Sequence, residues 1–113
     1  MAGLKVEGDE VIVELTGLEK LGAFHGDVRV PRAAVRAVRT VDDAMGAVKG
    51  LRSPGTAVPG WIGLGTWRRK GAKDFVAVHR HRRGVVVELE GASYARLIIT
   101  TDDPDGVQAA LRS

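Results

Sequence analysis

The sequence predicts a mainly β domain that ends in a helix. Short runs rich in β-branched residues recur along the chain, and turn residues separate them at short, even intervals. A length of 113 residues suits one domain, and 44% hydrophobic and 27% charged residues are typical of a folded globular chain. Turn signals spaced in this way favour an antiparallel meander that closes as a sandwich or a barrel.

The first predicted strands lie in the N-terminal third of the chain. In residues 11–15, apolar side chains at alternate positions share one face of a strand. Residues 18–24 are too short and irregular to classify. Residues 28–30 alternate and then meet Pro31, which ends a strand or places it at a sheet edge.

Residues 32–51 leave two interpretations open. Basic side chains would gather on one face of a helix and apolar side chains on the opposite face, as in an amphipathic helix. No capping residue stands at position 30 before Pro31, which argues against that helix. The alternation over residues 35–41 fits one face of a strand as well.

A loop and a glycine-rich strand follow. Residues 53–60 contain two Pro-Gly steps, which predict a loop of about two turns because proline presets one turn angle and glycine supplies the other. As a strand, residues 61–67 place Ile62, Leu64 and Thr66 on one face, and both tryptophans and two glycines on the other. These glycines lack the strand-to-helix context of a phosphate loop. They indicate curvature or a close approach of chain segments.

Turns and strands alternate over the C-terminal half. Turns are predicted at residues 68–73, 80–84 and 91–93, and strands at residues 74–79, 85–90 and 94–101. Asp103 then stands where an N-cap belongs, and Pro104 stands at the first helical position. Because Val107, Ala110 and Leu111 share one helical face, we expect a short C-terminal helix packed on the strands.

Positive charge is concentrated in one segment. The chain has 17 Lys+Arg and 14 Asp+Glu, a net charge of +3, whereas residues 68–83 hold seven basic side chains and one acidic side chain, Asp74. The seven candidate ligand-binding residues are Arg68, Arg69, Lys70, Lys73, Arg80, Arg82 and Arg83. Such a concentration favours an acidic partner. The alternative is that the cations keep an exposed hairpin soluble and prevent edge pairing.

Several classes of site are disfavoured. No cysteine occurs, which excludes disulfides, iron–sulfur clusters, thiolate zinc sites and cysteine nucleophiles. His25, His79 and His81 are weak zinc candidates because arginines flank the latter two and no carboxylate lies nearby in sequence. The serines lack a nucleophile elbow, and the paired acids at 42–43 and 102–103 suit turns and caps. We therefore expect no metal, no cofactor and no enzymatic activity.

The sequence also predicts a location. Residues 1–5 contain no apolar stretch of the kind that a signal peptide needs. No run of about 18 apolar residues exists that could span a membrane. We therefore expect a cytoplasmic protein.

Trp61 and Trp67 are the aromatic candidates. They flank two glycines on one predicted strand face and adjoin the basic segment. Exposed tryptophans beside cations could anchor at a membrane interface or stack on bases. The favoured interpretation is that both rings fill space over the glycines within the core.

Several stretches resemble a known family. They are residues 51–60, 65–67, 73–75 and 89–98, and Asp102-Asp103-Pro104. Together, over residues 28–112, they resemble small, largely uncharacterised bacterial proteins, mostly actinobacterial, with a pleckstrin-homology-like barrel. The resemblance implies a bent antiparallel barrel of about seven strands that a short C-terminal helix closes at one end. It also favours a strand over residues 35–41, with helical structure confined to 42–48.

Two departures separate this chain from lipid-binding pleckstrin-homology domains. Those domains carry a Lys and Arg cluster between their first two strands, where this chain has Lys20 alone. Their terminal helix contains a tryptophan, and residues 104–112 contain none. The resemblance therefore implies a fold more strongly than lipid binding.

The leading hypothesis is a non-enzymatic binding or scaffolding module. It would recognise an acidic partner, either a protein or an anionic membrane headgroup, through the seven basic residues. A less favoured alternative is a basic β-barrel that binds single-stranded nucleic acid on aromatic platforms, for which five aromatic residues exist. Another is a small-ligand carrier or enzyme that uses the barrel interior. A sheet edge or the Trp61 face could also pair two copies in a homo-oligomer.

Overall fold

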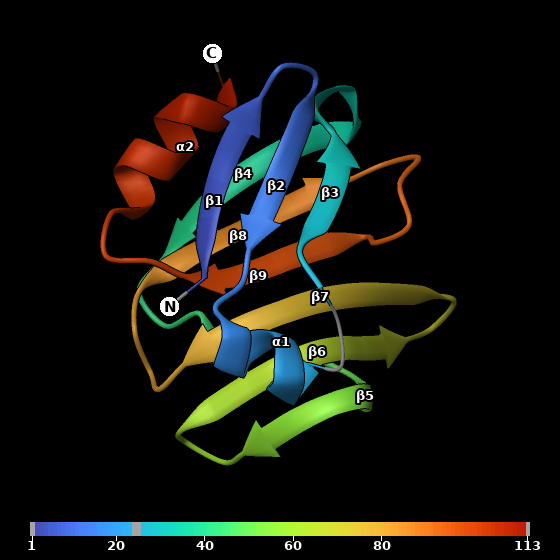
Figure 1. Cartoon of the computed structure of the whole chain (residues 1–113), viewed down its shortest axis with the longest axis vertical. Coiled ribbons are helices and arrows are strands. Elements are labelled where there is room, and N and C mark those ends of the chain that lie inside the picture. Colours follow the sequence, from blue (N-terminus) through green and yellow to red (C-terminus); the bar gives the residue numbers. More distant parts are fainter. Residues whose placement is uncertain (1, 24–25, 113) are drawn as a thin grey trace.

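The computed structural model describes residues 2–23 and 26–112 (Figure 1). Over these residues the chain is mainly β and has a C-terminal helix, as the sequence predicts. The strands are β1 (Gly3–Glu7), β2 (Glu10–Glu14), β3 (Val28–Pro31), β4 (Val35–Val41), β5 (Leu51–Val58), β6 (Ile62–Arg69), β7 (Ala72–His79), β8 (Gly84–Leu89) and β9 (Arg96–Thr100). The helices are α1 (Gly17–Ala23) and α2 (Pro104–Arg112), with 3-10 turns η1 (Arg32–Ala34) and η2 (Met45–Ala47).

The strands form two sheets rather than the expected closed barrel. The smaller sheet has the order β1-β2-β3, and the larger has the order β4-β8-β9-β7-β6-β5. The purely antiparallel meander is also wrong, because β9 inserts between β8 and β7 and runs parallel to β7. As a result, β4 and β5 are opposite edges of the larger sheet and do not pair to close it.

The main hydrophobic core lies between the two sheets. Valines at alternate positions of β2 and β3 pack against alternate positions of β7, β8 and β9. The side chains that these strands contribute to this core are Val11, Val13, Val28, Val30, Phe75, Ala77, Val85, Val87, Leu97 and Ile99. The period of two along each strand therefore sets which residues form this core.

A second core covers the opposite face of the larger sheet. Ala44 and Met45, in the segment that contains η2, pack with Trp67 and with apolar residues of β7, β8 and β9. The Ala44 N–H donates to the Arg82 carbonyl at 2.8 Å and fixes this segment to the β7–β8 connection. The central strands are thus buried on both faces, which explains their continuous apolar sequences.

Helix α1 begins with a capping box. The Thr16 hydroxyl accepts a hydrogen bond from the Glu19 N–H at 3.2 Å, and the Glu19 carboxylate accepts one from the Thr16 N–H at 2.9 Å. A Thr-x-x-Glu pattern is a sequence signature of a helix start. Thr16 and Glu19 therefore mark a helix start for the region that was left unclassified from the sequence alone.

Within residues 32–51, strand β4 occupies residues 35–41, so this range does not form one longer helix. Strand β4 pairs antiparallel with β8 and has a register shift between Val35 and Ala37. Val38 is buried, whereas Arg36 and Arg39 are exposed, and β4 is an edge strand of the larger sheet. Within residues 42–48, regular helical structure is confined to the short turn η2.

The loop predicted at residues 53–60 is wrong, because most of these residues belong to β5. Gly55 has φ 153° beside a register shift, so the first Pro-Gly step forms a bulge in an edge strand instead of ending it. An edge position tolerates Pro54, which has no N–H to donate. The second step, Pro59-Gly60, does form a turn, with Gly60 at φ 78°.

Helix α2 follows the sequence prediction closely. The Asp103 carboxylate accepts a hydrogen bond from the Gly106 N–H at 3.0 Å, as an N-cap does. Leu111 is buried and Val107 is half-buried, while Ala110 is exposed, so the packed face is narrower than predicted. The Gln108 amide also donates to the Val38 carbonyl at 2.8 Å and holds the helix against β4.

Candidate functional site

A basic hollow lies where the β6–β7 turn faces the β8–β9 loop. The turn and its strand ends contribute four of the predicted binding residues: Arg68, Arg69, Lys70 and Lys73. Residues 89–95 form the opposite wall, and the volume is about 780 Å³. Both walls lie at the right-hand end of β7 in Figure 1. The Lys73 carbonyl accepts the Ala95 N–H at 2.8 Å and ties the loop to β7.

A buried ion cluster fixes one wall of this hollow. Asp74 is 0% exposed, and its Oδ2 accepts hydrogen bonds from Arg69 Nε at 2.8 Å and from Arg96 Nη2 at 2.7 Å. Burial by itself would raise the pKa of Asp74, but the bonds from Arg69 and Arg96 outweigh it and lower the pKa. The only acid of the basic segment is therefore neutralised internally, and Arg69 is held in place.

The remaining charges of the hollow are arranged so that positive charge dominates. Lys73 Nζ lies 4.9 Å from the centre of the buried Tyr94 ring, which in turn packs edge-on against Phe75. Glu90, the acidic side chain in the lining, pairs with Arg36 at 3.2 Å. Among the described residues, Arg68 and Lys70 have no ion-pair partner.

Tyr94, Glu90 and Arg96 also belong to this region, although no local sequence pattern pointed to them. Arg96 lies directly beside Asp74 because β7 and β9 pair in parallel. Parallel pairing is set by the order of strands in the sheet, which no local pattern encodes. The charge pattern therefore located the cations but not the wall that faces them.

The other three predicted binding residues form a separate cluster. Arg80, Arg82 and Arg83 lie in the β7–β8 connection, at the opposite end of β7. The eight residues of β7 span roughly 25 Å at about 3.3 Å per residue. Arg83 Nη2 donates to the Asp102 carbonyl at 2.7 Å. The sequence interpretation assumed that the seven cations share one surface. The structure instead divides them between the two ends of β7.

The two tryptophans have different surroundings. Trp67 is 7% exposed in the second core, and its ring lies over Gly63, as the packing interpretation predicts. Trp61 is 60% exposed, and the Arg80 guanidinium lies 4.8 Å from its ring centre. The expectation that both rings fill the core is therefore wrong for Trp61, because it lies in the turn before β6 and not within the strand.

The described histidines contact different carboxylates. His79 Nε2 lies 2.7 Å from Glu19 Oε2, and His81 Nδ1 lies 2.8 Å from Asp43 Oδ2. Strand β7 ends at His79, and Arg80 has φ 58°, so the chain turns between the two histidines. His25 lies outside the described residues. Across the described part of the chain, no group of three or more His, Asp and Glu side chains could hold a metal ion.

We expect acid to remove a stabilising contribution of Glu19. Burial opposes ionisation, but the Thr16 N–H and His79 outweigh it and lower the pKa of Glu19 from 4.5. The ionised carboxylate therefore stabilises the fold at neutral pH, and the contribution is lost as the pH falls below 4.5. Urea unfolding at pH 7 should show Glu19→Gln about 1–3 kcal/mol less stable than the wild type. A difference that does not shrink below pH 4 would contradict this assignment.

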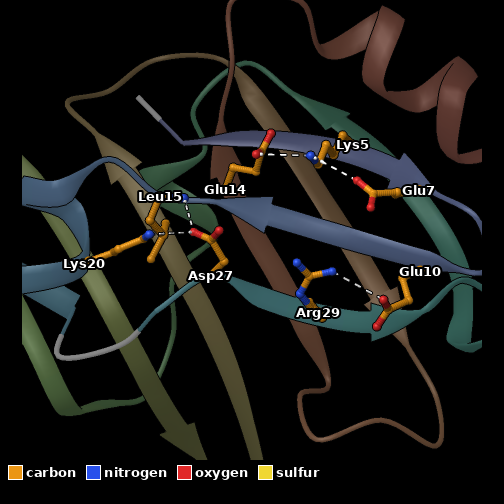
Figure 2. Close-up of polar contacts among 8 residues, drawn as sticks. All are labelled: Lys5, Glu7, Glu10, Glu14, Leu15, Lys20, Asp27 and Arg29. Carbon is orange, nitrogen blue, oxygen red and sulfur yellow. Dashed lines mark hydrogen bonds and ion pairs between the residues drawn. The ribbon is translucent and has the colours of Figure 1, made fainter.

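The outer face of the smaller sheet provides a contrast to the basic hollow (Figure 2). There Lys5 pairs with Glu7 at 3.2 Å and Glu14 at 3.3 Å, and Arg29 pairs with Glu10 at 3.4 Å. Figure 2 also shows Asp27 accepting the Leu15 N–H at 2.9 Å, beside Lys20. Each of these charged side chains has an ion-pair partner on this face, whereas Arg68 and Lys70 of the basic hollow have none among the described residues.

Comparison with known protein families, curated proteins and solved structures finds no match. Within residues 2–23 and 26–112, neither helix has the length and apolar character that crossing a membrane requires.

Proposed function

We propose that this protein is a non-enzymatic binding module that takes an acidic partner into the hollow at the β6–β7 turn. One observation supports it most: four cationic side chains line a single hollow of about 780 Å³, and its one acidic lining residue, Glu90, is already paired. Such a site attracts negative charge and speeds association with an acidic partner.

An acidic protein segment is the favoured partner. The Asp74–Arg69 pair holds one guanidinium in position, and Arg68 and Lys70 add charges that a flexible acidic chain can meet in several ways. Ser93 and the loop backbone add hydrogen-bonding groups on the opposite wall. An anionic headgroup shares the same chemistry and is an outcome of the test below.

Single-stranded nucleic acid is less favoured as the partner. Binding without sequence preference needs aromatic rings exposed beside the cations. Tyr94 is 7% exposed beneath Lys73, and Trp61 lies at the other end of β7.

The pleckstrin-homology-like resemblance also remains a proposal. The two sheets and helix α2 agree with it, whereas the parallel pairing of β7 and β9 departs from it.

Two matched triple variants test the site. Arg68→Glu/Lys70→Glu/Lys73→Glu reverses the hollow, and Arg80→Glu/Arg82→Glu/Arg83→Glu reverses the same charge at the far end of β7. We expect a polyglutamate peptide to shift amide signals of residues 68–73 and 90–95 in a salt-sensitive way. The first variant should weaken binding at least about tenfold, the second far less. Circular dichroism should show both variants folded.

Equal losses in the two folded variants would contradict the assigned site, since net charge alone would then explain binding. Headgroup and single-stranded oligonucleotide titrations at two salt concentrations decide between partner classes. A steep salt dependence for the oligonucleotide alone would replace the protein partner by nucleic acid. Light scattering on the same samples measures the predicted self-association.

A further inference from the structure

A small apolar slot lies on the face of the larger sheet opposite the smaller sheet. It has a volume of about 230 Å³, and its lining side chains are all apolar, among them Met45, Ala57, Trp67 and Val78. Gly63 keeps it open, because a Cβ there would approach Val78 Cγ2 to 3.2 Å and Trp67 Cη2 to 3.6 Å. Water gains little in such a slot, whereas an apolar group would fit it well.

A cationic hollow adjoins the slot. It has a volume of about 500 Å³ and is lined by Trp61, His79, Arg80 and Arg82. Val58 and Ile62 line both spaces, so an elongated molecule could reach from one into the other. The Ala44 N–H bond to the Arg82 carbonyl places the arginine connection beside the η2 segment that covers the slot.

The charges of this second hollow favour a negative group. The Arg80 guanidinium lies over the Trp61 ring. The lining of this cationic hollow contains no acidic side chain. Two carboxylates lie nearby: Glu19 is 3% exposed and engaged by His79, and Asp43 is engaged by His81. A guanidinium placed over an aromatic ring is partly ordered before any ligand arrives, which lowers the entropy lost on binding.

We propose that these two spaces form one site for a small amphipathic carboxylate. The apolar tail would occupy the slot beside Trp67, and the carboxylate would meet Arg80 and Arg82. This site is distinct from the basic hollow at the β6–β7 turn and does not depend on the function proposed there. An engineered cavity of about 150 Å³ takes up benzene, so this slot suits an alkyl chain of several carbons.

The probes are butanoate, hexanoate and octanoate, titrated into labelled protein. The indole N–H signals of Trp61 and Trp67 report the cationic hollow and the slot separately. We expect affinity to rise about fourfold for each methylene added until the slot is full. Hexylammonium, whose alkyl chain is one methylene longer and whose charge is opposite, should still bind at least about tenfold more weakly than hexanoate.

Matched variants test separately the slot that would hold the apolar tail and the arginine that would bind the carboxylate. Ala57→Leu or Val48→Phe should fill the slot, remove the dependence on chain length and abolish the Trp67 shift. Arg80→Gln should weaken hexanoate binding about tenfold. Arg29→Gln, on the outer face of the smaller sheet, removes an equal charge from a residue paired with Glu10 and should leave hexanoate binding unchanged.

Equal binding of hexanoate and hexylammonium would overturn the proposal, as would affinity independent of chain length. Shifts of residues 68–73 without shifts of the two indoles would also overturn it, because the carboxylates would then bind the basic hollow instead.

Discussion

Replacing Asp74 by asparagine is expected to destabilise the fold by about 3–5 kcal/mol. Asp74 is fully buried and holds Arg69 and Arg96 through bonds of 2.8 and 2.7 Å. Asparagine removes the negative charge with which Arg96, a side chain 8% exposed, forms its ion pair. Folded domains have only about 5–15 kcal/mol to lose, so this single atom exchange should lower the urea midpoint strongly.

Two controls show whether the buried charge is the cause. Arg69→Gln removes the half-exposed partner and should cost about 1 kcal/mol or less. Asp74→Leu combined with Arg96→Met removes both buried charges and should recover much of the loss. If the double variant is no more stable than Asp74→Asn, packing and not the unpaired charge explains the defect.

Acid should act on the same cluster. The pKa of Asp74 is lowered in the fold from 3.8, so its contribution is complete at neutral pH and declines below that value. The gap between wild type and Asp74→Asn should therefore narrow in acid, in the same direction as for Glu19. The pKa of each carboxylate is lowered for the same reason: both groups are buried, but hydrogen-bond donors stabilise the ionised form more than burial disfavours it.

Local patterns predicted several of the strands, and helix α2, well. The β-branched runs of β2, β7, β8 and β9 and the Asp103-Pro104 start of α2 each depend on neighbours in sequence. The sequence analysis missed β1, and it mistook β5 for a loop because a Pro-Gly step usually ends a strand. At an edge, the same step is absorbed as a bulge at Gly55.

The arrangement of the strands could not be predicted in this way. Inserting β9 between β8 and β7 creates one parallel pair and prevents closure of a barrel. That order follows from burying apolar strands on both faces, which depends on contacts between distant residues. The division of the basic segment into two clusters has the same origin, since it follows from the length and direction of β7.

Replacing Trp67 by alanine is the other substitution expected to have a large effect on folding stability, and replacing Trp61 is its contrast. Trp67→Ala should cost about 3–5 kcal/mol, because the ring fills the second core and its loss leaves a cavity between the sheet and the η2 segment. Trp61→Ala should cost about 1 kcal/mol or less, since that ring is 60% exposed and contacts Arg80. At a urea slope of about 2 kcal/mol per molar, the first substitution lowers the midpoint by roughly 2 M.

Fluorescence makes the comparison independent of unfolding. With Trp61 replaced by phenylalanine, emission comes from the buried Trp67 and should be blue-shifted and shielded from iodide. With Trp67 replaced instead, emission should be red-shifted and readily quenched. Equal stability losses for the two alanine variants, or equal quenching of the two rings, would contradict the division between a core tryptophan and a surface tryptophan. That division matters for function, because an exposed ring beside Arg80 is available to a ligand whereas Trp67 can only form the wall of a slot.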